Sequence, residues 1–133
     1  MPKKLSALAM VVVFSALAAA SRPSSIVGTW MGVANQTAVQ LVITTQATAT
    51  APCKPITGTL NNLPSGGASN IQGFYCPGTG RFSFVRKDIT TNDTFQSYSG
   101  NVSNTGTTLR MTGVFAELSL MNALGEYNFS VTK

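Results

Sequence analysis

The chain has 133 residues with nine basic side chains, four acidic side chains and no histidine, which gives a formal net charge of +5. The absence of histidine excludes a His-based triad or general base, and two cysteines alone cannot complete a tetrahedral zinc site. After residue 20 the basic residues are scattered, and there only Arg86 and Lys87 are adjacent, whereas nucleic-acid binding usually needs a denser basic stripe. We therefore expect no enzyme, no cofactor, no metal and no nucleic-acid partner.

The N-terminal residues have the pattern of a signal peptide. A basic start at Lys3 and Lys4 is followed by the almost unbroken apolar run Leu5–Phe14 and by small residues up to Ala20. The alternative is a retained membrane anchor, which needs about 20 apolar residues, and this run is shorter. The pattern predicts cleavage after Ala20 and export to a secreted or periplasmic location, with no membrane span after cleavage.

Removal of residues 1–20 leaves residues 21–133, which is enough chain for one domain with a single core. Seven basic and four acidic side chains remain, so the net charge falls to +3, a value more typical of a solubility feature than of a binding surface. The domain contains Cys53 and Cys76, and an oxidising compartment favours one disulfide between them. A pair of free thiols is the alternative.

Short strand-like runs dominate the exported part, which is rich in Thr, Ser, Asn and Gly. Eight runs are separated by turn residues: 26–33, 38–45, 54–60, 70–76, 81–87, 94–103, 109–117 and 126–132. The best helix candidate, Ala116–Ala123, is weak. Closely spaced runs predict an antiparallel up-and-down meander, and closing it into a barrel removes its exposed edges. We therefore predict an all-β, eight-stranded antiparallel up-and-down β-barrel, whose interior is either filled or holds one small ligand.

The positions of the cysteines agree with a hairpin of the third and fourth runs. If the hairpin is centred between Pro64 and Ser65, Cys53 lies opposite Cys76. Cross-strand partners have Cβ atoms about 4.5–5.5 Å apart, which is near the disulfide range of about 3.5–4.5 Å. The register therefore predicts a Cys53–Cys76 disulfide.

Several short motifs resemble the avidin and streptavidin family. The Gly-x-Trp of Ile26–Trp30 resembles the first strand of that family, and Ile56–Leu60 resembles its third-strand Thr-Gly-Thr-Tyr. Phe82–Val85 resembles the fifth strand, and Tyr98–Gly100 resembles the sixth-strand Trp-Ser-Gly. Residues 109–115 and 127–131 fall where the last two strands would lie. The resemblance implies a calycin-type barrel, which lipocalins share through their own Gly-x-Trp, and it makes a homo-oligomer conceivable.

The biotin-pocket residues of that family are mostly not retained. Gly32 occupies the position of an Asn, and Leu60 that of a Tyr that donates to the ureido oxygen. Thr37 and Asn128 are loose matches to a Ser/Thr and to the Asp that pairs with the ureido group, and Trp30 is the only tryptophan. Because each unmatched buried polar group costs about 1–3 kcal/mol, we do not expect avidin-strength biotin binding.

Aromatic side chains in the second half of the chain could either line a cavity or fill the core. The set consists of Phe82, Phe84, Phe95, Tyr98, Phe115, Tyr127 and Phe129. Trp30 could likewise line a pocket, or it could plug the closed end of the barrel beneath a basic side chain such as Arg86 or Arg110.

The leading hypothesis is a non-catalytic avidin-like or lipocalin-like barrel that binds a small, largely apolar molecule. Its candidate ligand-binding residues are Trp30, Thr37, Leu60, Phe84, Tyr98, Phe115 and Asn128. The alternative is a filled barrel that acts through the loops Asn61–Ser69 or Asp88–Asp93 as a protease inhibitor or interaction module. A cavity inside the barrel favours the first, and its absence favours the second. An enzyme would have to use Glu117 or Glu126, which are better explained as surface acids.

Overall fold

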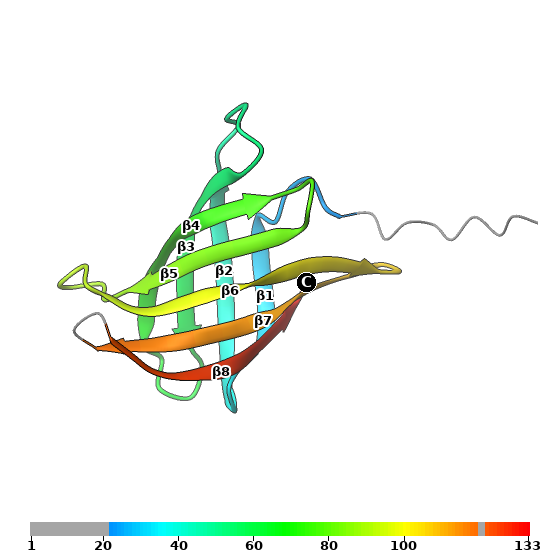
Figure 1. Ribbon diagram of the computed structural model, residues 1–133. Helices are drawn as coiled ribbons and strands as arrows, with labels where there is room; N and C mark the ends of the chain where they lie inside the picture. The colour runs from blue at the N-terminus through cyan, green and yellow to red at the C-terminus, as the bar shows by residue number, and fades with distance from the viewer. Residues whose placement is uncertain (1–21, 120–121) are drawn as a thin grey trace, which may run out of the picture.

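The computed structural model describes residues 22–119 and 122–133, so the predicted signal peptide, residues 1–20, lies outside the described residues. Eight antiparallel strands follow one another around a closed barrel in which β8 pairs back onto β1 (Figure 1). The strands are β1 (Gly28–Ala34), β2 (Thr37–Gln46), β3 (Lys54–Asn62), β4 (Ala68–Cys76), β5 (Arg81–Lys87), β6 (Thr94–Thr105), β7 (Thr108–Ser119) and β8 (Asn122–Thr132). The predicted up-and-down barrel is thereby confirmed.

The weak helix candidate Ala116–Ala123 is wrong. Its first part, up to Ser119, continues β7, and β8 begins at Asn122. Phe115 pairs with Tyr98 on one side and Tyr127 on the other, so the segment after it is drawn into ladders with both neighbouring strands. Tertiary pairing thus outweighs the local helix propensity of Ala, Glu and Leu.

The hairpin of β3 and β4 has the predicted register. Lys54 pairs with Tyr75, which places Cys53 beside Cys76 with their Cα atoms 4.1 Å apart. The two cysteines form a disulfide in the structure, and the prediction is confirmed. The disulfide closes the edge of the hairpin beside the β4–β5 turn.

Glycines allow neighbouring strands of this small barrel to approach closely. Five strands each carry one on the inward face, midway between two buried side chains: Gly32, Gly58, Gly73, Gly100 and Gly113. Gly100 and Gly113 are cross-strand partners, and a Cβ atom on either would lie 2.0 Å from a backbone oxygen of the opposite strand. The backbones of neighbouring strands therefore lie in contact at these positions, where no other residue fits.

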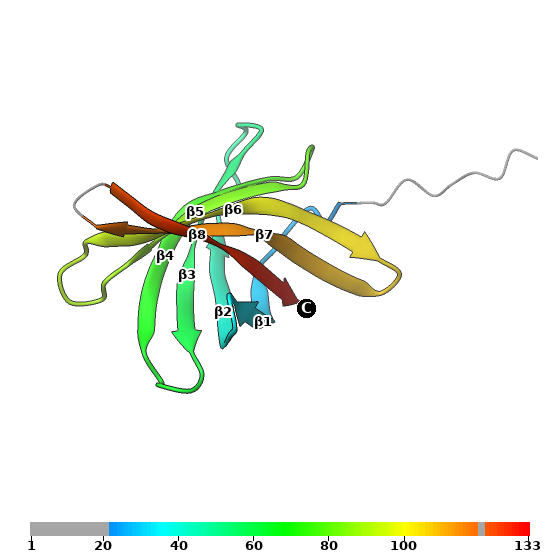
Figure 2. The ribbon, with the colours of Figure 1, turned by 60° about the horizontal axis from the view of Figure 1, so that its bottom comes forward.

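The two ends of the barrel differ. Strands β1, β3, β5 and β7 all run toward one end, which we call the mouth end, and it carries the β1–β2, β3–β4, β5–β6 and β7–β8 connections (Figure 2). The other end, which we call the closed end, carries the remaining three connections, residues 22–27 and the C-terminal Lys133.

Residues 22–27 plug the closed end. Ile26 and Trp30 are fully buried there, and the indole Nε1 of Trp30 donates to the Ile26 carbonyl oxygen at 2.9 Å. The Tyr75 hydroxyl donates to the carbonyl oxygen of Pro23 at 2.5 Å, which fastens the segment to β4. Trp30 is therefore a core plug. Arg86 does not cover it, because its guanidinium carbon lies 5.2 Å from the centre of the Phe95 ring.

A stack of aromatic rings fills most of the barrel interior. Ring centroids of consecutive members from β5 to β8 lie 5.7, 4.8, 4.9 and 5.3 Å apart, in the order Phe82, Phe84, Tyr98, Phe115 and Tyr127. Phe129 packs edge-on against three of these rings. Such close, offset contacts are the favoured packing of aromatic side chains, so the interior is a core for most of its length. Over the described ranges, no helix has the length and apolar character needed to cross a membrane.

Candidate functional site

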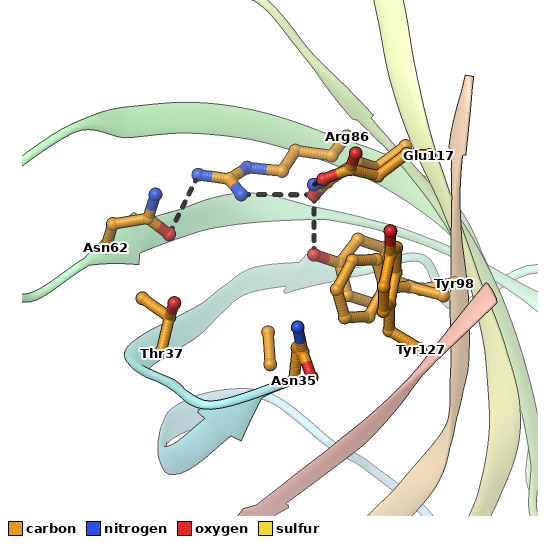
Figure 3. A pocket seen from close by; sticks show the side chains of 10 residues that line it. Asn35, Thr37, Asn62, Arg86, Tyr98, Glu117 and Tyr127 are labelled. Atoms are coloured by element: carbon orange, nitrogen blue, oxygen red, sulfur yellow. Dashed lines mark hydrogen bonds between the residues drawn. The ribbon is translucent and has the colours of Figure 1, made fainter. Parts of the chain in front are cut away.

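The mouth end of the barrel contains a cavity of about 150 Å³. At roughly 30 Å³ per water molecule, this space corresponds to about five waters, less than the roughly 300–1,000 Å³ of pockets for drug-sized ligands. Its lining is Ala34, Asn35, Thr37, Asn62, Arg86, Gln96, Tyr98, Phe115, Glu117 and Tyr127 (Figure 3). The lining combines aromatic rings from the top of the core with polar side chains from the ends of the strands.

The tight turn between β1 and β2 forms one wall of the cavity. Asn35 adopts a left-handed backbone conformation with φ of 55°, which Asn tolerates better than most residues and which suits a two-residue hairpin. Its backbone N–H donates to the carbonyl oxygen of Asn128 at 2.7 Å, so the turn is held against β8. This arrangement keeps Asn35 and Thr37 beside the cavity (Figure 3).

Arg86 is the buried cation of the site, with 5% of its surface exposed. One guanidinium nitrogen, Nη1, donates to Gln96 Oε1 at 3.1 Å, and Nη2 donates to Asn62 Oδ1 at 3.4 Å and to the Leu60 carbonyl at 3.5 Å. Its Nε atom is buried and has no partner in the described part of the chain. All of these acceptors are neutral oxygens. Because a buried charge is costly unless it is paired, the guanidinium favours an anionic or strongly accepting group in the cavity.

Gln96 connects the charged and phenolic groups of the site. Its Oε1 accepts from Arg86 and also from the Tyr98 hydroxyl at 2.7 Å, and its Nε2 donates to Glu117 Oε1 at 3.4 Å. These bonds fix the amide with its oxygen toward the cation and its nitrogen toward the carboxylate. The cavity therefore presents a positive and a negative side chain that are bridged by a neutral amide.

Tyr98 stays protonated under ordinary conditions. Burial raises the pKa of its phenol to about 12, although the nearby Arg86 acts in the opposite direction. A protonated phenol is consistent with its role as donor to Gln96. The residue thus contributes a neutral hydroxyl and an aromatic face to the site, and it is not a base.

The raised pKa of Tyr98 predicts a loss of stability at high pH. An unfolded tyrosine has a pKa near 10. Below pH 10 the phenol is therefore protonated in both states, and its full contribution to the free energy of unfolding is present. Between pH 10 and 12 the unfolded chain releases this proton while the folded protein keeps it, so the free energy of unfolding falls by about 2–3 kcal/mol. Urea unfolding at pH 8, 10 and 11.5 measures this decrease.

The Tyr98→Phe variant provides the control. It should lose less stability than the wild type between pH 10 and 11.5, because one titrating group has been removed. Tyr75, whose pKa is also raised by burial, remains in both proteins and contributes equally to the loss of stability in each. If the free energy of unfolding falls equally with pH in the two proteins, the raised pKa of Tyr98 is contradicted.

The structure brings together only some of the residues predicted for the ligand site. Thr37, Tyr98 and Phe115 line the cavity. The others do not: Trp30 lies in the plug of the closed end, Leu60 and Phe84 are buried in the core, and Asn128 is exposed on β8. Leu60 still contributes through its backbone oxygen, which accepts from Arg86.

Sequence reasoning missed the polar lining of the cavity, above all Arg86, Gln96 and Glu117. Each lies two positions from a buried aromatic residue on the same strand, and β-strand side chains two positions apart share one face. Arg86 follows Phe84, and Glu117 follows Phe115. A charged residue that continues an inward-facing aromatic pattern at the end of a strand was the signal that could have identified them.

No protein-family model, curated protein or solved structure matches this chain. The function must therefore be inferred from the chemistry of the cavity itself. Within the described ranges, no three His, Cys, Asp or Glu side chains are grouped so that they could hold a metal ion. The cavity contains a cation, a carboxylate, amides and a neutral phenol, which together suit the recognition of a small polar molecule.

Proposed function

We propose that this protein is an exported binding protein that takes a small molecule into the cavity at the mouth of its barrel. The observation that carries the proposal is Arg86, a buried guanidinium at an open cavity whose hydrogen-bond acceptors are all neutral. A carboxylate or a similarly strong acceptor on the ligand would supply the missing negative partner. Hydrogen bonds of this charged kind are typically worth about 1.5–3 kcal/mol.

The cavity also limits the rest of the ligand. Its volume of about 150 Å³ admits a small molecule or the end of a larger one. Phe115 and Tyr127 offer aromatic surface for a flat apolar part, while Glu117 can accept from a donor group. The ligand class we propose is therefore a small organic acid or acceptor with one apolar face, more polar than the largely apolar molecule expected from the sequence.

The resemblance to avidin-like and lipocalin-like barrels supports binding in preference to catalysis. The departures at Gly32 and Leu60 argue against biotin, since the side chains that would match its ureido group are missing. The aromatic stack below the cavity occupies the part of the barrel interior that a long acyl chain would need. A short ligand held at the mouth fits these features best.

Titration of the barrel with a panel of small aliphatic and aromatic carboxylates, followed by native mass spectrometry and calorimetry, tests the proposal. We expect a one-to-one complex with at least one member, and a loss of affinity of roughly 10–100-fold in Arg86→Met. The control is Arg81→Met, which removes an exposed arginine at the other end of the barrel. If Arg86→Met folds with wild-type circular dichroism and binds the same acid equally well, the assignment of Arg86 fails.

A second candidate function is that of a filled barrel that acts through its loops as a protease inhibitor or interaction module. The aromatic core favours it, as do two large apolar side chains exposed in mouth-end loops, Leu63 at 46% and Ile89 at 60%. Assays against a panel of secreted proteases test this candidate. Inhibition that is lost in Ile89→Ser supports it, and the absence of inhibition by the wild type counts against it.

A further inference from the structure

The charged side chains of the protein are divided between the two ends of the barrel. Five bases lie at the closed end or at the strand ends that face it: Arg22, Lys54, Arg81, Arg110 and Lys133. All four acids lie at the mouth end, together with Arg86 and Lys87: Asp88, Asp93, Glu117 and Glu126. The side-chain charge is therefore +5 at the closed end and −2 at the mouth end, which sum to +3. The modest net charge conceals a strong asymmetry along the barrel.

The bases of the closed end keep their full charge, since Lys54 and Lys133 donate only to neutral backbone carbonyl oxygens. Arg22, Arg81, Arg110 and Lys133 are exposed, and Lys54 is half-buried. Arg22 Nη1 donates to the Gly78 carbonyl at 3.2 Å, which holds this arginine over the β4–β5 turn. Arg81 and Arg110 make no side-chain hydrogen bond to any other residue that the structure describes. Because no acid lies among them, their charges add in the same direction instead of cancelling.

We propose that the closed end docks on the surface of an anionic phospholipid bilayer. The five bases come from the N-terminal segment, three different strands and the C-terminal residue, so they surround the end of the barrel and form no continuous stripe. A distribution of this kind suits a flat surface of many phosphate headgroups better than a nucleic-acid groove. In this orientation the acidic mouth end points away from the membrane, and the cavity stays open to solution.

The position of the apolar N-terminal run supports the same partner. The run Leu5–Phe14 is joined to the barrel through Arg22, at the closed end. Before cleavage of the predicted signal peptide, the closed end is therefore the end that is tethered to the membrane. Its basic charge would keep the processed protein near an anionic leaflet after release. This proposal does not depend on the identity of the ligand at the mouth.

Vesicle co-sedimentation tests the proposal with the processed barrel, since all eight strands follow residue 22. Vesicles of phosphatidylcholine with 30% phosphatidylglycerol are compared with pure phosphatidylcholine, at 20 mM and 500 mM NaCl. We expect binding only to the anionic vesicles, and we expect it to weaken at least tenfold at high salt because screening shortens the range of the attraction. No binding to anionic vesicles at 20 mM NaCl would overturn the proposal.

A pair of charge-matched variants localises the surface. Arg81→Gln combined with Arg110→Gln removes two charges at the closed end, and Lys87→Glu changes the net charge by the same amount at the mouth end. We expect the first to lower the partition coefficient by roughly tenfold or more and the second by less than twofold. Equal decreases of the partition coefficient would show that only net charge matters, and they would overturn the assignment of the closed end as the docking surface. Binding to duplex DNA with the same variant sensitivity, without vesicle binding, would also overturn it.

Discussion

Replacing Trp30 with alanine is expected to lower the free energy of unfolding by about 3–5 kcal/mol. The side chain is fully buried at the closed end, and its indole N–H donates to the Ile26 carbonyl. Alanine would leave a large cavity under the N-terminal segment and would also leave that carbonyl without its donor. Since small domains have a total stability of about 5–15 kcal/mol, this one change removes a large part of it.

Urea unfolding followed by far-ultraviolet circular dichroism measures this effect, because the variant lacks the only tryptophan fluorophore. Phe74→Ala is the matched control, since Phe74 is an aromatic residue with 52% of its surface exposed on β4. We expect its loss to stay below about 1 kcal/mol. A similar loss in both variants would show that Trp30 is not the plug of the barrel.

Removal of the disulfide by the double substitution Cys53→Ala and Cys76→Ala is expected to cost about 3 kcal/mol. The two residues are 23 positions apart in the sequence and lie at the edge of the β3–β4 hairpin. Without the crosslink, the unfolded chain gains the conformational freedom of the loop between them, while the backbone ladder of the hairpin remains. We expect the denaturant midpoint to fall and the m-value to rise, because the unfolded chain without the crosslink is less compact.

The wild-type protein under reducing conditions is the natural control for the double variant. Reduction should lower its midpoint to a similar value, because the same constraint is lost. The single variants are less informative, since each leaves a free thiol that can crosslink two molecules. An unchanged midpoint in the double variant would mean that the loop is already ordered in the unfolded ensemble.

The fold could be predicted because the features that identify it, alternating strands and short turns, lie within short stretches of the sequence. Alternation such as that of Val39, Leu41 and Ile43 identifies strands, and short turns then leave an antiparallel meander as the simplest arrangement. The disulfide followed from one assumption about the centre of a hairpin, and the observed pairing of Lys54 with Tyr75 has that centre. The failure at Ala116–Ala123 has the same origin, because local propensity was the only guide there.

The site could be predicted only in part because it depends on which strand ends meet in space. Tyr98 and Phe115 lie at the cavity because they belong to the aromatic set whose side chains point into the barrel. The sequence suggested Arg86 only as one of two possible partners of Trp30, and the two residues lie near opposite ends of the barrel. Only the strand order around the closed barrel shows that Arg86, Gln96 and Glu117 meet at the mouth.

The pairing that seals the barrel has a consequence for the export that the N-terminal sequence predicts. Ala34 pairs with Phe129, so the last contact to form joins segments from nearly opposite ends of the sequence. A chain that emerges from a translocation pore N-terminus first cannot complete this seam until its final strand has passed through. The crosslinked hairpin can form earlier, because its partners are close in sequence. If the predicted signal peptide directs export, delivery across the membrane precedes closure of the fold, and the incomplete sheet exposes two unpaired edges in the meantime.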